Sequence, residues 1–218
     1  MFSKEKIIPS LHFVTQNIAQ GHRPWEQAEL ACRGGARWVS LRTTDMSYGE
    51  LLPTALRTQE VCEHYKARFI VNDNVLLAKE ICADGVHLGR TDVPVDQARD
   101  YLGDAAYIGS TANNFEDIQR AVYLGVDYIA LGPTHFSKSK ELKSLIVNPS
   151  NFLMIKRKCI EAHLYVPLIA TGGVSSDDLE IFLDLGMHGI AVSSSINMSE
   201  DPVFETEKLL LKLNSVIS

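Results

Sequence analysis

Two aspartates in the middle of the chain have the side-chain type and spacing of magnesium ligands. Asp73 directly follows one apolar run, and Asp92 follows the next run by a few residues. Mg²⁺ prefers hard oxygen ligands and commonly takes only one or two protein carboxylates, which leaves its other positions for water and phosphate oxygens. Either aspartate alone would serve well as the cap of a following helix. Their joint position after successive runs favours a shared metal site.

Cations occur at comparable points of the chain. Arg42 closes an earlier apolar run, and Lys138 and Lys140 lie in a long polar segment after the sixth run. Arginine offers phosphate a planar fork of donors, whereas lysine is a mobile point charge. These cations and the metal could hold a diphosphate between them. The alternative for the lysines, together with Lys143, is a solvated basic loop.

Small polar residues close several other runs. Thr171-Gly172-Gly173 follows the seventh run and Ser193-Ser194-Ser195 the eighth, which favours phosphate binding by backbone N–H groups. A Gly-Gly pair alone is weak evidence, because turns also need glycine. Ser110-Thr111 ends the fifth run and is either a pair of donors to a ligand or the cap of a helix beginning near Asn113.

The histidines divide into two cases. His87 is flanked by Val86 and Leu88 inside an apolar run, which favours an interior histidine with satisfied hydrogen bonds over a ligand. His135 lies beside the lysine-containing segment, where an imidazole could titrate next to a bound anion or only fill space. The order of residues reveals no Ser-His-Asp or Cys-His arrangement.

The elements that must position these side chains are eight short apolar runs separated by stretches long enough for a helix. A strand–helix alternation repeated eight times predicts an α/β fold, a (β/α)8 TIM barrel with its active site at the carboxyl ends of the strands. An open doubly wound sheet would show similar runs, but the even spread of the strands and the lack of GxGxxG after the first one favour the barrel. The predicted strands are Leu11–Thr15, Trp38–Arg42, Arg68–Asn72, Gly85–Gly89, Ala106–Thr111, Tyr128–Gly132, Pro167–Gly172 and Gly189–Ser193.

Glycines and aspartates mark the boundaries between these elements. Four units share a junction in which an amphipathic stretch ends near Gly or Asp before a buried run begins, as around Gly34-Gly35 and Gly125. Glycine just past a helix end supplies the left-handed residue that releases the chain into a strand. Asp177-Asp178 and Asp201-Pro202 predict helix starts.

Bulk properties limit the domain number and the partners. No Pro/Gly/Ser-rich tract or charge block divides residues 1–218, so one domain is expected. A formal charge of −6 argues against nucleic acid as the main partner, whereas a few local cations can still capture a small anion. No apolar stretch is long enough to span a membrane, and four widely spaced cysteines without a CxxC pair predict reduced thiols in a cytoplasmic protein. The sequence does not indicate an oligomeric state.

Over nearly the whole chain, the sequence resembles a known family, thiamine phosphate synthase and its relative the thiazole tautomerase. The segments that carry the resemblance are Phe69-Ile70-Val71-Asn72-Asp73-Asn74, Ala83-Asp84-Gly85-Val86-His87-Leu88-Gly89 with Asp92 behind it, Gly109-Ser110-Thr111, Asp127-Tyr128-Ile129-Ala130-Leu131-Gly132-Pro133 and Thr171-Gly172-Gly173.

The resemblance implies a reaction and a role for individual residues. The synthase joins hydroxymethylpyrimidine diphosphate to a thiazole phosphate, or its carboxylate form, and releases diphosphate. By position, Asp73 and Asp92 would ligate Mg²⁺, and diphosphate would be held by Arg42, Asn72 and Lys140, with Ser110 also at that substrate. Contacts to thiazole phosphate would come from Ser137, Ser139, Gly173, Ser193 and Ser194.

Several positions depart from the family pattern. Thr43-Thr44 stands where the family usually has Glu or Met and then Lys, so one diphosphate-binding cation is missing. Ser40 replaces a Gln that commonly contacts the pyrimidine. The tautomerase lacks the metal carboxylates, so Asp73 and Asp92 favour the synthase. A tautomerase-like enzyme and a non-catalytic protein that binds thiazole or thiamine phosphate remain the alternatives.

Overall fold

Eight parallel strands close into a barrel in the computed structural model, which describes residues 6–17, 21–44, 46–133, 149–176 and 178–217. Each strand pairs with its neighbour along the chain, and β8 pairs with β1 through Leu11 opposite Ile190. This last pairing rules out an open sheet and confirms the predicted barrel. The strands are β1 Leu11–Val14, β2 Trp38–Leu41, β3 Arg68–Asn72, β4 Gly85–Leu88, β5 Tyr107–Ala112, β6 Tyr128–Leu131, β7 Leu168–Thr171 and β8 Gly189–Val192.

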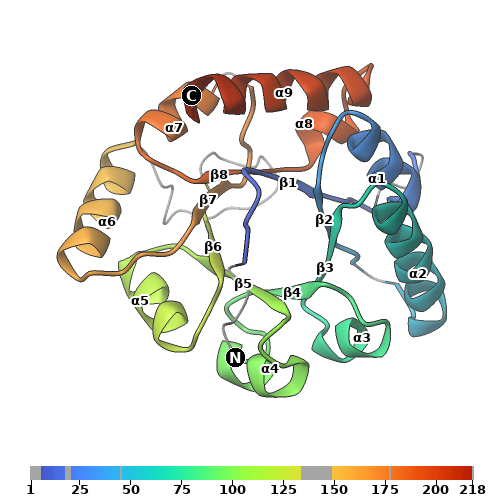
Figure 1. Cartoon of the computed structure of the whole chain (residues 1–218), viewed down its shortest axis with the longest axis horizontal. Coiled ribbons are helices and arrows are strands. Elements are labelled where there is room, and N and C mark those ends of the chain that lie inside the picture. Colours follow the sequence, from blue (N-terminus) through green and yellow to red (C-terminus); the bar gives the residue numbers. More distant parts are fainter. Residues whose placement is uncertain (1–5, 18–20, 45, 134–148, 177, 218) are drawn as a thin grey trace.

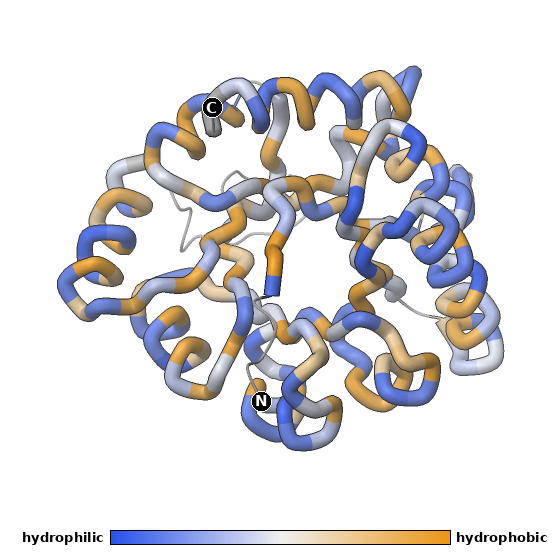
Figure 2. The backbone as a smooth tube through the Cα atoms, viewed as in Figure 1, coloured by the Kyte–Doolittle hydropathy of each residue, from blue (hydrophilic) through white to orange (hydrophobic). Residues whose placement is uncertain are grey.

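The helices surround the strands on the outside of the barrel (Figure 1). Coloured by hydropathy, the helices carry hydrophilic and hydrophobic residues in alternation, as expected for helices that pack one face on the barrel (Figure 2). Their bounds are α1 Pro24–Arg33, α2 Tyr48–His64, α3 Val75–Glu80, α4 Val95–Leu102, α5 Phe115–Tyr123, α6 Pro149–Glu161, α7 Leu179–Asp184, α8 Ser194–Asn197 and α9 Pro202–Ile217.

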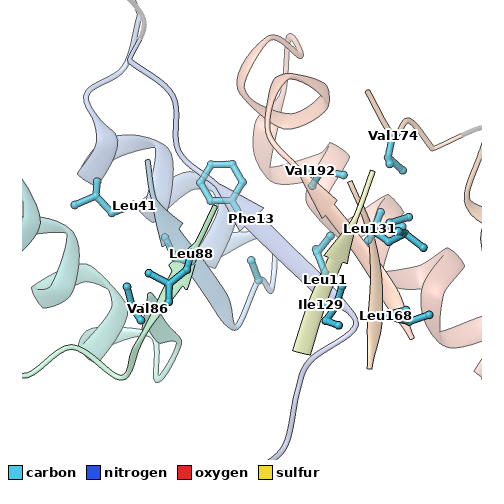
Figure 3. Packing of buried hydrophobic residues seen from close by; sticks show 14 of the residues in the cluster. Leu11, Phe13, Leu41, Val86, Leu88, Ile129, Leu131, Leu168, Val174 and Val192 are labelled. Carbon is cyan, nitrogen blue, oxygen red and sulfur yellow. The ribbon is translucent and has the colours of Figure 1, made fainter. Parts of the chain in front are cut away.

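Successive side chains of each strand point alternately outward and inward. The outward residues, such as Leu41 and Leu88, pack with buried helix residues in one large apolar layer, part of which is seen in Figure 3. The inward residues form a separate cluster that includes Trp38, Tyr107 and Tyr128. Strand residues therefore reach either the helix layer or the barrel interior, and only inward ones can approach a site in the barrel.

Aromatic rings fill the barrel interior. His12 stacks on Trp38 with ring centroids 4.5 Å apart, and Trp38 meets Tyr107 and Tyr128 edge-on at 5.3 and 5.2 Å. Gly109 makes room for this packing, because a Cβ atom there would lie 2.1 Å from the ring of Tyr128. The interior is thus a packed core, as in other barrels of this kind, and a ligand must bind above it.

The predicted boundaries between helices and strands are largely confirmed. Gly35 and Gly125 have φ of 100° and 85°, in the left-handed region that a glycine adopts without strain. In the junction before β4 this conformation falls instead on Cys82, with φ of 53°. Asp178 is the N-cap of α7, and the side chain of Asp201 accepts hydrogen bonds from two N–H groups at the start of α9.

Two further expectations concern the membrane and the thiols. Within the described ranges, no helix combines the length and the apolar character needed to cross a bilayer. All four cysteines are free, as predicted; Cys32, Cys62 and Cys159 are buried and Cys82 is exposed.

Candidate active site

The carboxyl ends of the strands bring together several of the residues that the sequence singled out. Asn72 and His87 face each other in register on β3 and β4, and Asp73 extends this ladder by donating its N–H to the carbonyl of His87 at 2.9 Å. Thr171 and Ala191 pair near the ends of β7 and β8. Because the strands are parallel, all these ends open on one mouth of the barrel.

The carboxyl groups of Asp73 and Asp92 meet at this mouth. They lie close enough to share a hydrogen bond, and partial burial together with this neighbour raises the pKa of Asp73 to about 6. The cation of Arg42 acts in the opposite direction and lowers the pKa. Two acids in such a position repel each other when both are ionised, and a bound cation would remove that repulsion.

Neither aspartate is occupied as a helix cap. Asn74 caps α3, since its side-chain oxygen accepts the N–H of Leu77 at 2.9 Å. Asp92 accepts the N–H of Gly89 at 2.6 Å, which holds the turn after β4, and the N-cap of α4 is Pro94. The capping interpretation is therefore wrong for both residues.

The donor set fits a magnesium ion. Within the described residues there is no group of three or more His, Cys, Asp or Glu that could hold a metal, so the mouth offers two carboxylates. Mg²⁺ is commonly bound by one or two carboxylates together with water and substrate phosphate, whereas Zn²⁺ sites use three or four protein ligands. Among the described residues, the buried Oδ1 of Asn72 also has no hydrogen-bond partner, which leaves it free for a ligand in the mouth.

Arg42 stands at the edge of the same mouth. Its backbone N–H is fixed by the hydroxyl of Thr15 at 3.0 Å, which ties the end of β2 to the end of β1. Its side chain is exposed, yet close enough to Asp73 to act on that carboxyl group. Arg42 is thus available to an anion that approaches the aspartate pair.

The hydroxyl group that faces the mouth from β5 belongs to Thr111 rather than to Ser110. Ser110 pairs with Leu88 and Ile129, both of which point into the outer helix layer. The hydroxyl of Thr111 lies 3.0 Å from Nε2 of His87, on the inward face. The expectation for Ser110 fails because strand alternation turns it away, and Asn114, rather than either residue, caps α5.

A short chain of hydrogen bonds supports Thr111 from below. Nδ1 of His87 lies 3.1 Å from the hydroxyl of Tyr128, so His87 is an interior histidine with both nitrogens satisfied, as predicted. Desolvation lowers the pKa of His87 to about 4, so that the ring is neutral at pH 7. If the Tyr128 hydroxyl donates to Nδ1, then Nε2–H donates to Thr111, whose own proton is free to point into the mouth.

The loops after β7 and β8 are the place where the sequence predicts a phosphate site. Gly172 and Gly173 both adopt left-handed backbone conformations, with φ of 87° and 83°. The hydroxyl of Ser193 is committed to the carbonyl of Val14 at 2.5 Å, which joins β8 to β1. The neighbouring hydroxyl of Ser195 is buried and has no partner in the part of the chain that the structure describes. Of the serine run, Ser195 therefore has the hydroxyl left for a ligand, while Ser194 is exposed at the start of α8.

The departures from the family pattern also lie around the mouth. Ser40 is buried on the inward face of β2, above Trp38 and below Arg42. Thr43 is half-buried and Thr44 is exposed, with its carbonyl accepting the side-chain N–H of Asn17 at 3.0 Å. Neither Thr43 nor Thr44 supplies the positive charge that the family usually has in this segment.

Some predicted residues lie outside the described part of the chain. Residues 134–148 belong to this group, and with them the expected contacts of Ser137, Ser139 and Lys140, as well as Lys138 and His135. Sequence reasoning missed Thr111 as an inward residue, although it shares the parity of Tyr107 and Gly109. It also passed over Ser195, whose burial no local pattern indicates.

Comparisons with known proteins identify the family of this chain. A family model described as thiamine monophosphate synthase matches residues 11–196. Thiamine-phosphate synthase of Bacteroides thetaiotaomicron is 37% identical over 201 residues, which cover 92% of this chain and 96% of the relative. That of Flavobacterium johnsoniae is 39% identical, covering 91% and 95%. The structure of thiamine phosphate pyrophosphorylase from Pyrococcus furiosus superposes with a TM-score of 0.84 at 25% identity, covering 96% of this chain and 97% of that one. The chain belongs to the thiamine monophosphate synthase family.

Proposed function

We propose that this enzyme joins 4-amino-5-hydroxymethyl-2-methylpyrimidine diphosphate to 4-methyl-5-(2-phosphoethyl)thiazole, or to its carboxylate form, and releases diphosphate, together with CO₂ when the carboxylate form is the acceptor. The observation that carries the proposal is the pairing of Asp73 with Asp92 beside Arg42, at the mouth of a barrel whose family is known. A thiazole monophosphate alone would not require two facing carboxylates. A diphosphate substrate that binds together with a magnesium ion does require such a pair of carboxylates.

The first half of the reaction is departure of the diphosphate. Mg²⁺ held by Asp73 and Asp92 would neutralise charge on the leaving group. Arg42 would add a fork of donors to the same oxygens, and the amide of Asn72 would donate another hydrogen bond. Lys140, which the resemblance implies at this substrate, would add a further positive charge. All these groups stabilise charge that grows as the bond to the pyrimidine breaks, so they lower the barrier more than they strengthen substrate binding.

The second half is capture of the pyrimidine cation by the thiazole nitrogen. The electron-rich aminopyrimidine stabilises that cation, so no strong general base is required. The chain must therefore hold the two rings in contact and exclude water. Gly173 and the serines of α8 would anchor the thiazole phosphate, with Ser137 and Ser139 as further contacts by resemblance, and Ser40 would lie beneath the pyrimidine.

The two-substrate assay tests this proposal directly. Purified protein with both half-substrates and Mg²⁺ is expected to form thiamine phosphate and diphosphate in equal amounts. EDTA should stop the reaction, and Mg²⁺ should restore it. Absence of product at high enzyme concentration would reject the synthase.

The alternatives give different results in matched experiments. A tautomerase-like enzyme would convert the thiazole carboxylate phosphate without pyrimidine diphosphate and without Mg²⁺. A binding protein would show tight calorimetric binding of thiazole phosphate or thiamine phosphate and no turnover.

We also propose a cytoplasmic location, which four free thiols support.

A further inference from the structure

A large hollow lies at the end of the barrel opposite the candidate active site. Its volume is about 1660 Å³, and its lining comes mainly from residues that directly precede β1 to β6, at the amino ends of these strands. Three carboxylates line it, namely Asp84, Asp104 and Asp127, and six basic side chains line it, namely Lys6, Arg37, Lys66, Arg68, Lys79 and Arg99. The lining thus has a formal excess of three positive charges in a chain whose net charge is −6.

Two of the three carboxylates are already saturated by structural bonds. Asp127 binds Lys6 at 2.9 Å and Arg99 at 2.7 Å, and also accepts the backbone N–H of Ile108 at 2.7 Å. Asp84 binds Arg68 at 2.7 Å and accepts the N–H of Phe69 at 2.8 Å. These bonds fix the starts of the strands, so neither acid is free to neutralise the remaining cations.

Three cations of the hollow have no carboxylate partner among the described residues. Arg37 donates only to two backbone carbonyls, at 2.8 and 3.1 Å, which do not cancel its charge. Lys79 lies 5.7 Å above the ring of Tyr101, and Lys66 is exposed at the end of α2. Mutual repulsion of such a group is relieved when a multiply charged anion binds between its members.

We propose that this hollow binds a small anion that carries several phosphate groups, such as inorganic tripolyphosphate or the triphosphate of a nucleotide. Arginine forks and lysine point charges together suit phosphate oxygens. A longer polyanion such as nucleic acid is disfavoured, because the acidic remainder of the protein would repel it.

The aromatic groups of the hollow predict which part of a nucleotide is recognised. Tyr107 is buried, and Lys6 and Arg68 already lie over its ring at 5.7 and 5.5 Å. With these cations over a buried ring, Tyr107 exposes too little surface for stacking a base. ATP and tripolyphosphate should accordingly bind with similar affinity.

Trp38 offers a reporter for this binding. Its ring touches Tyr107 on the floor of the hollow, and the chain has only two tryptophans, so Trp25→Phe leaves Trp38 as the single emitter. The experiment titrates this variant with tripolyphosphate and with ATP in EDTA, by fluorescence and by calorimetry. A second background, Trp25→Phe with Arg42→Gln, weakens anion binding at the opposite mouth.

The hollow is then changed by Lys66→Asn with Lys79→Gln, where asparagine suits the left-handed backbone of residue 66, with φ of 54°. The matched control, Arg33→Gln with Lys158→Gln, removes two positive charges outside the hollow. We expect saturable binding that weakens roughly tenfold or more in the first double variant and stays within about twofold in the control, because charge-assisted hydrogen bonds are strong.

Four results would contradict the proposal. Calorimetry could show no saturable binding of either anion. The two double variants could weaken binding equally, which would mean that binding depends only on the net charge of the protein. Binding could vanish with Arg42→Gln and survive the change of Lys66 and Lys79, which would assign it to the active-site mouth. ATP binding far tighter than tripolyphosphate would contradict recognition through phosphate alone. None of these outcomes depends on whether the synthase reaction is observed.

Discussion

At the scale of single residues, mutation should separate the proposed metal site from the proposed thiazole phosphate site. Asp92→Asn keeps an oxygen that can accept the Gly89 N–H but removes one of the two charges that face a cation. Mg²⁺-dependent turnover is expected to fall by roughly 100-fold or more, since even indirect partners of a metal ligand contribute 10–100-fold. Steady-state kinetics at several Mg²⁺ concentrations measure this loss.

Thiazole phosphate binding is the internal control for that variant. Its affinity, measured by calorimetry without pyrimidine diphosphate, should stay nearly unchanged, because the predicted phosphate site lies across the mouth on β7 and β8. Equal losses of turnover and of thiazole phosphate affinity would contradict the division into two sites.

Adjacent residues of β5 provide a second test at this scale. Thr111→Val removes the hydroxyl group bonded to His87 and is expected to lower kcat/KM by roughly 10- to 100-fold, the effect of one hydrogen bond to a charged group. Ser110→Ala, which changes an outward side chain, should stay within about twofold, by the same reasoning that a residue without substrate contact removes no such bond. Thr111→Ser should restore most of the activity, whereas a purely structural role of the methyl group would leave it impaired. A loss of activity in Ser110→Ala but not in Thr111→Val would show that the inference from strand register is wrong.

At the scale of the elements, the sequence predicts strands well and side-chain direction less well. All eight strands appear within one residue of their predicted bounds, because Gly, Asp and Asn mark the ends of buried runs. The direction of Ser110 could not be predicted, since it depends on the register of β5 against β4 and β6. The commitment of Ser193 to Val14 likewise depends on closure of the barrel, which brings residues 179 positions apart into contact. The sequence also could not decide whether Asp73 or Asn74 caps α3, because Asp and Asn are equally good N-cap residues.

The turn after β2 carries a prediction about the missing cation. Thr44→Lys places a positive charge two residues beyond Arg42 and is expected to lower the KM for pyrimidine diphosphate by about two- to fivefold, the range of an exposed charge pair. Thr44→Gln is the control of similar length without charge. The advantage of lysine over glutamine should shrink as salt concentration rises. Equal KM values for the two variants would show that another group already supplies this charge.

The packing of β5 against β6 gives a test of the barrel interior. Gly109→Ala would place a methyl group 2.1 Å from the ring of Tyr128, and nearby rings leave little room for that ring to move. Overpacking of this kind should lower the free energy of unfolding by about 1–3 kcal/mol. In Gly49→Ala, the matched control on α2, the new methyl group meets nothing within 4 Å, and stability should be unchanged or slightly higher. Urea denaturation compares the two, and equal midpoints would contradict a tightly filled interior.

At the scale of the whole molecule, the two ends of the barrel serve different purposes around one packed centre. The amino ends of the strands hold the ion pairs of Asp84 and Asp127, which fasten neighbouring strands. The carboxyl ends hold side chains, such as Asn72 and Ser195, that have a buried polar atom with no partner among the described residues. Unpartnered polar atoms lower stability unless a ligand satisfies them. Substrate binding is therefore expected to raise the unfolding temperature of this chain.

The histidines of the centre make stability depend on pH. Burial lowers the pKa of His12 to about 3, with the nearby His87 as a smaller cause, and desolvation lowers that of His87 to about 4. Both groups bind a proton in the unfolded chain near pH 6.5 but not in the folded one, so the unfolded state gains protons first as the pH falls. Their contribution is complete above pH 6.5 and is lost between about pH 6.5 and 3.

The expected acid dependence has a definite slope. In this window, each histidine lowers the free energy of unfolding by about 1.4 kcal/mol for every pH unit of acidification. Asp73, whose pKa is raised in the folded chain, has the opposite effect between about pH 6 and 4 and offsets the contribution of one histidine there. Urea denaturation in EDTA from pH 7.5 to 4.5 measures this slope. His12→Phe keeps a ring against Trp38 but has no proton to bind, so its stability should fall less steeply with acid than that of the unaltered chain. Parallel pH curves for the two proteins would mean that His12 is not held neutral in the core, and the packed aromatic centre on which the barrel depends would then need another explanation.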